Sequence, residues 1–90
     1  MKLIYRQHAI KRMYERRITE AEIHRALEAG EVIENYSNDT PHPSVLLLGT
    51  AGSKTVHVVY ADNIEGNERI IITVYEPDTA IWHEDLKTRR

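Results

Sequence analysis

The chain has 90 residues, a formal net charge of −2 and no cysteine, so it fits a single domain (residues 1–90) without disulfides or thiolate metal sites. Apolar runs such as residues 45–48 and 70–72 are too short to cross a bilayer. The N-terminus also lacks the apolar core of a signal peptide, so we expect a cytoplasmic protein with no membrane partner.

The first third of the chain is predicted to form a strand and two helices. Residues 2–5 read as a short strand, and residues 7–16 have the apolar spacing of a helix. A second helix should begin at Thr19, because Thr19 and Glu22 have the spacing of a capping box. Gly30 is predicted to end this helix in the left-handed conformation.

From Glu31 onward the pattern becomes extended. We predict strands at residues 31–36, 45–49, 54–61 and 68–76, separated by a loop at 37–44 and turns at 51–53 and 62–67. After Pro77, Asp78 is predicted to cap a short C-terminal helix that carries Ile81, Trp82 and Leu86. The expected fold is α+β, in the order β-α-α-β-β-β-β. Its two helices should pack on one face of an antiparallel sheet.

Two groups of side chains could carry chemistry. His8, Arg12 and Arg16 are four residues apart and should form one stripe on the first helix. On the strands, simple alternation places His57 on the less apolar sheet face. The same alternation divides the last strand into Ile70, Ile72 and Val74 on one side and Ile71, Thr73 and Tyr75 on the other. We therefore predict a concave site in which His57, Thr73 and Tyr75 lie beside the helix stripe.

These residue types suit RNA cleavage without a metal. The reaction needs a base for the 2′-hydroxyl, an acid for the 5′-oxygen and a cation for the phosphate. Histidine, tyrosine and arginine can fill these roles, whereas no spacing typical of metal ligands is present. A basic face is also predicted near the N-terminus, from Arg6, Lys11, Arg12, Arg16 and Arg17.

Each candidate also has a structural interpretation. His57 could be a strand histidine that is simply hydrogen-bonded. The helix arginines could form surface ion pairs with Glu15, Glu20 or Glu22. Tyr75 and Trp82 could be core aromatic residues.

An ordered set of motifs resembles a known bacterial family, the domain of unknown function 4258, from about Tyr5 to Trp82. The motifs are H-A-x-x-R-M-x-x-R, T-E-A-E-I with A-L-E-A-G-E-V-I-E, P-x-P-S-x-L-L-L-G, V-H-V-V and I-T-V-Y-E-P-D followed by W. That family is similar to the RelE-like toxins, which are small metal-independent endoribonucleases often encoded beside an antitoxin. The resemblance implies RNA and an antitoxin as partners, the latter of a zinc-ribbon or helix-turn-helix type.

The resemblance implies a candidate site with no cofactor and no metal. Its catalytic residues would be His8, His57, Arg12 and Tyr75, and its substrate-binding residues Arg16, Thr73 and Trp82. We add Lys54 as a further candidate for substrate binding. Arg17 stands where the family usually has glycine. We therefore expect a metal-independent endoribonuclease, the toxin of a toxin–antitoxin pair. The alternatives are a non-catalytic module of the same fold that binds a protein or RNA, and a small metal-dependent hydrolase.

Overall fold

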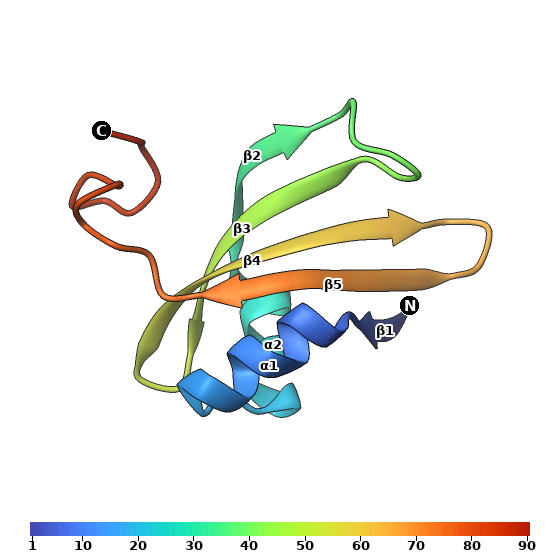
Figure 1. The fold of residues 1–90 in the computed structure, drawn as a ribbon, viewed down its shortest axis with the longest axis horizontal. Coiled ribbons are helices and arrows are strands. Elements are labelled where there is room, and N and C mark those ends of the chain that lie inside the picture. Colours follow the sequence, from blue (N-terminus) through green and yellow to red (C-terminus); the bar gives the residue numbers. More distant parts are fainter.

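The computed structural model describes residues 1–90 and has two layers, a five-stranded sheet and two helices on one of its faces (Figure 1). The elements in chain order are β1 (Lys2–Tyr5), α1 (Gln7–Arg16), α2 (Glu20–Ala29), β2 (Glu31–Tyr36), β3 (Ser44–Ala51), β4 (Lys54–Asn63) and β5 (Glu68–Tyr75). The strand order is β1-β5-β4-β3-β2, and α1 packs against β5 while α2 packs against β3. The predicted α+β order is confirmed. The sheet is mixed, however, because β1 runs parallel to β5.

Local signals set the start of α2, whereas packing sets its end. Thr19 accepts a hydrogen bond from the Glu22 backbone and Glu22 accepts one from the Thr19 backbone, so the predicted capping box is confirmed. The left-handed conformation predicted for Gly30 is wrong, because its backbone is extended, with φ −78° and ψ 174°. A Cβ at this position would lie 2.5 Å from the Ala26 carbonyl oxygen and from Leu47 Cδ2. Glycine therefore serves close packing here, not a left-handed turn.

The left-handed residue of the helical layer is Arg17, which follows α1. Its φ is 56°, and its backbone N–H points back to the carbonyls of Met13 and Tyr14. This conformation costs a residue with a Cβ about 1 kcal/mol. The turn between the helices is nevertheless formed, with Arg17 in place of the glycine that the sequence resemblance leads one to expect.

The main core lies between the helices and one sheet face. It contains side chains from both layers: Ala9, Met13, Ile18, Ile23, Ala26, Leu47, Ala51, Val56, Val58, Tyr60, Ile71 and Val74. Ile71 and Val74 both belong to it because the register shifts at Ile72, so that Ile71 pairs with Tyr60 while Thr73 pairs with Val59. The predicted grouping of Ile71 with Thr73 and Tyr75 is therefore wrong. One extra residue in a strand reverses the alternation beyond it.

The C-terminal segment, residues 77–90 and here called the tail, contains no helix, so the predicted terminal helix is wrong. Its aspartates bind nearby backbone N–H groups: Asp78 accepts from Ala80, and Asp85 accepts from Lys87 and Thr88. Such local bonds favour turns over a continuing helix. Figure 1 shows the tail rising from the end of β5 towards β2, away from the helices. None of the helices is both long and apolar enough to span a membrane.

Candidate functional site

The sheet face opposite the helices carries a buried histidine as the centre of a polar cluster. His57 in β4 is 0% exposed, and both of its ring nitrogens have partners. Nε2 lies 2.7 Å from the carbonyl oxygen of Leu86, and Nδ1 lies 3.1 Å from the Tyr75 hydroxyl. A carbonyl only accepts, so Nε2 carries the hydrogen, and in the neutral ring Nδ1 accepts from Tyr75. Burial lowers the pKa of His57 and thereby favours this neutral form, although the bond to Leu86 and the charge of Glu34 act in the opposite direction.

Aromatic rings hold the tail against His57. Trp82 is 2% exposed and meets the imidazole edge to face, with 4.6 Å between ring centroids. Tyr75, which pairs with His57 across β4 and β5, lies at 5.2 Å in a similar arrangement. The Arg89 guanidinium lies over the Trp82 ring, 4.5 Å from the ring centroid. The tail therefore covers His57 with its one tryptophan.

A second part of the cluster joins β2 to the tail. Arg89 donates to both carboxylate oxygens of Glu34, at 3.0 and 3.1 Å. The Tyr36 hydroxyl donates to the same carboxylate, since residues two apart in β2 share a face. The hydrogen bonds from Arg89 lower the pKa of Glu34, which is therefore ionised at neutral pH. Burial raises the pKa of Tyr36 and so keeps its hydroxyl protonated.

The residues predicted for one site fall into two places. His57, Tyr75 and Trp82 meet in the cluster, and Thr73 stands on the same strand as Tyr75 and on the same face, opposite Val59. The other predicted residues lie with the helical layer. These are His8, Arg12 and Arg16 on α1, and Lys54, whose Nζ is 3.4 Å from the Arg17 carbonyl oxygen.

The single concave site predicted from the sequence is therefore not formed. The helices cover the apolar face of the sheet, and the sheet itself separates the α1 stripe from His57. Arg16 reaches the end of β5, where its guanidinium lies 3.7 Å from the carboxylate of Glu76, the residue that follows Tyr75. The end of β5 is thus the place where the two groups of residues approach one another.

Three residues of the cluster were missed by the sequence analysis, namely Glu34, Tyr36 and Arg89. The alternating positions of Glu34 and Tyr36 in a predicted strand indicate that their side chains share a face. Nothing local indicates that this face meets Arg89, which lies 55 residues further along the chain. Their contact depends on the path of the tail.

The cluster brings together groups that can exchange protons and bind an anion. It offers an ionised carboxylate, a guanidinium, two protonated phenols and a neutral imidazole, from β2, β4, β5 and the tail. The Glu34–Arg89 pair is partly exposed, with side-chain exposures of 23% and 54%. A phosphate can accept the same two parallel hydrogen bonds from a guanidinium, so it could take the place of the carboxylate on Arg89.

The fold and this polar cluster describe a small α+β domain with a polar cluster on the sheet face opposite the helices. The family model named Domain of unknown function (DUF4258) matches residues 5–76, and the chain belongs to this family. No curated protein and no solved structure matches the chain. Trp82 and Arg89 lie outside the matched region, so the tail adds to the site from beyond the family's matched segment.

Proposed function

We propose that this protein is a metal-independent endoribonuclease of the RelE-like type, the toxin of a toxin–antitoxin pair. The proposal rests chiefly on the cluster in which Glu34 and Arg89 lie beside Tyr36, His57 and Tyr75. The RelE-like assignment rests on the sequence resemblance, and the order of elements agrees with it. As a toxin, it would be held inactive by an antitoxin, for which the sequence resemblance suggests a zinc-ribbon or helix-turn-helix protein.

In the proposed reaction the phosphate of RNA displaces Glu34 from Arg89. Glu34, which is ionised at neutral pH, takes the proton of the 2′-hydroxyl, and the 2′-oxygen forms a bond to phosphorus. Arg89 neutralises the charge that develops on the phosphate oxygens. Tyr36 donates its proton to the leaving 5′-oxygen as the bond from phosphorus to that oxygen breaks. The products are a 2′,3′-cyclic phosphate and a 5′-hydroxyl.

His57 has a positioning role in this scheme. Its bond from Tyr75 and its bond to Leu86 fix the end of β5 and the tail, and so hold Arg89 over the sheet. The sequence-based candidates His57 and Tyr75 therefore act through Arg89 in this proposal. The stripe of His8, Arg12 and Arg16 contributes from α1 through contacts with RNA outside the cluster.

The test is cleavage of a labelled RNA oligonucleotide by purified protein in the presence of a metal chelator. We expect cleavage by the wild type, and a loss of about 100-fold or more in Glu34→Gln, because that change removes the base while keeping the shape. Arg89→Lys should lose activity as well, because lysine cannot form the two-pronged contact. Glu65→Gln, in the exposed turn between β4 and β5, is the matched control and should cleave normally. Equal cleavage by Glu34→Gln and the wild type would refute the assignment.

A second candidate function is a non-catalytic interaction module. One observation favours it: both nitrogens of His57 and the carboxylate of Glu34 are occupied by partners within the chain, as in a cluster that only fastens the tail. This candidate predicts no new RNA ends and no growth arrest when the wild type is expressed. Arg89→Lys would then change thermal stability alone.

A further inference from the structure

The chain has two groups of basic residues, and they differ in how far they are neutralised. In the tail, Lys87 and Arg89 lie 3.0 Å from the carboxylates of Glu31 and Glu34. Lys87 and Arg89 are therefore compensated by β2, and Arg90 donates to the backbone carbonyls of Thr79 and Trp82. The second group, here called the α1 basic surface, consists of Arg6, Lys11, Arg12, Arg16 and Arg17.

The α1 basic surface is poorly compensated. Residues 6–17 carry five positive charges and a single negative one, Glu15, in a chain whose total is −2. Its two ion pairs are long and exposed, with Arg12 3.8 Å from Glu15 and Arg16 3.7 Å from Glu76. Exposed pairs at such distances contribute little, so these guanidinium groups remain available to an outside anion.

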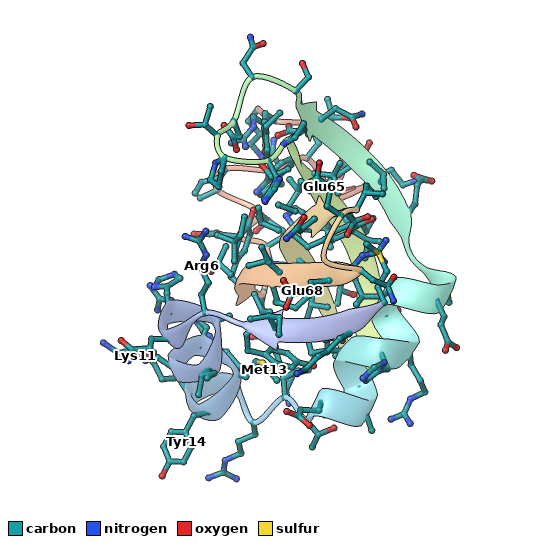
Figure 2. All side chains as sticks on the ribbon, turned by 90° about the vertical axis from the view of Figure 1, so that its right-hand side faces the viewer. Arg6, Lys11, Met13, Tyr14, Glu65 and Glu68 are labelled. Atoms are coloured by element: carbon teal, nitrogen blue, oxygen red, sulfur yellow. The ribbon has the colours of Figure 1, made fainter.

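The same helix presents an aromatic ring to solvent. Tyr14 is 86% exposed, and Figure 2 shows Tyr14 and Lys11 extending from α1 away from the sheet. The ring therefore has a face that the rest of the chain leaves uncovered. Cations beside a free aromatic ring are the combination with which proteins bind single-stranded nucleic acids, because phosphates meet the charges and bases stack on the ring.

We propose that the α1 basic surface binds single-stranded RNA that crosses the helix. A base would stack on Tyr14 beside Lys11, and phosphates would contact Lys11 and then Arg12 and Arg16 on the other side of the helix. The inference rests on the proposed function in one respect, namely that RNA is the substrate. Successive turns of α1 place cations about 6 Å apart along the helix, which suits a polymer with regularly spaced charges. Because Arg16 reaches Glu76 at the end of β5, an RNA strand on α1 continues past this point towards Tyr75 and the cluster.

RNA is favoured over an acidic segment of another protein. The exposed large apolar side chains of α1 are Ile10 and Tyr14 alone, so the surface offers a peptide little apolar area to bury. The flat ring of Tyr14 instead provides a stacking platform that every base can use. Binding of an acidic protein segment is the competing outcome of the experiment.

The experiment measures binding of a fluorescent oligouridylate of about twelve nucleotides, by fluorescence anisotropy at several salt concentrations. The oligonucleotide carries 2′-O-methyl groups, so it cannot be cleaved and binding is read independently of catalysis. For Lys11→Gln/Arg16→Gln we expect at least tenfold weaker binding. For this variant the slope of log affinity against log salt concentration should become shallower by about 0.7 for each phosphate that is no longer neutralised. For Tyr14→Ala we expect about fivefold weaker binding or more, with the salt dependence unchanged.

Two controls separate this inference from the proposed catalysis. Arg25→Gln removes an exposed arginine from α2 and should bind within twofold of the wild type. The second control is the wild type, assayed in parallel for cleavage of the unmethylated oligonucleotide. Binding without cleavage would overturn the proposed function and leave this inference standing. Wild-type affinity in the double α1 variant would overturn the inference. A second pair of results would also overturn the inference: polyglutamate displaces the labelled oligonucleotide as well as unlabelled oligonucleotide does, and Tyr14→Ala binds the labelled oligonucleotide as tightly as the wild type. The surface would then fit an acidic protein segment.

Discussion

Replacing Trp82 by alanine should release the tail from the sheet. A buried tryptophan removes roughly 150–250 Å² from water, worth about 4–6 kcal/mol. The exposed pair Lys87–Glu31 contributes about 0–1 kcal/mol. The partly exposed, two-pronged pair Arg89–Glu34 contributes somewhat more, but the two together do not replace this burial. Because Trp82 lies outside the main core, we expect the helices and sheet to stay folded while the tail detaches.

The readout is the pKa of His57, followed by NMR of its imidazole during a pH titration. Burial lowers this pKa in the wild type, so exposure of the ring should raise it towards the ordinary value of 6.5. Amide exchange in residues 77–90 should accelerate at the same time. Ile81→Ala changes the neighbouring, half-exposed side chain and should leave both measurements unaltered. An unchanged His57 pKa and a protected tail in Trp82→Ala would refute this reasoning.

Three further predictions concern titration and backbone geometry. Because the folded-state pKa of His57 is lowered, tail docking should be complete above pH 6.5 and should weaken as pH falls from 6.5 through the folded-state pKa. The variant His57→Gln should lose this pH dependence in the amide-exchange assay. A variant that kept the pH dependence would contradict the assignment to His57. Gly30→Ala should lower the free energy of unfolding in urea by about 1–3 kcal/mol, because its Cβ would meet a backbone oxygen and Leu47. In the control Gly66→Ala the Cβ meets only flexible side chains, so the free energy of unfolding should change little. Equal unfolding midpoints for the two variants would argue against the close-packing explanation. Arg17→Gly should stabilise the protein by about 1 kcal/mol by relieving the left-handed backbone, and a lower thermal midpoint would show that the arginine side chain contributes more than the strain costs.

Most elements of the fold could be predicted from the sequence because their causes are local. The capping box joins Thr19 to Glu22 within one helical turn, and the strands follow alternation over a few residues. The candidate site was predicted in part: His57, Tyr75 and Trp82 were identified and do meet, whereas the roles assigned to them stay predictions. The stripe of His8, Arg12 and Arg16 was placed on the correct helix, but the helix lies on the other side of the sheet from His57.

The sequence by itself determined where the helices begin, which segments form strands, and that α1 carries an excess of positive charge. Only the tertiary structure decided the rest. The extra residue at Ile72 directs the Ile71 side chain towards the core. The path of the tail brings Arg89 to Glu34 and Leu86 to His57. The physical reason is the range of the interactions. Capping and periodicity act between residues a few positions apart, whereas strand register and the docking of the tail depend on how distant side chains fill one another's space.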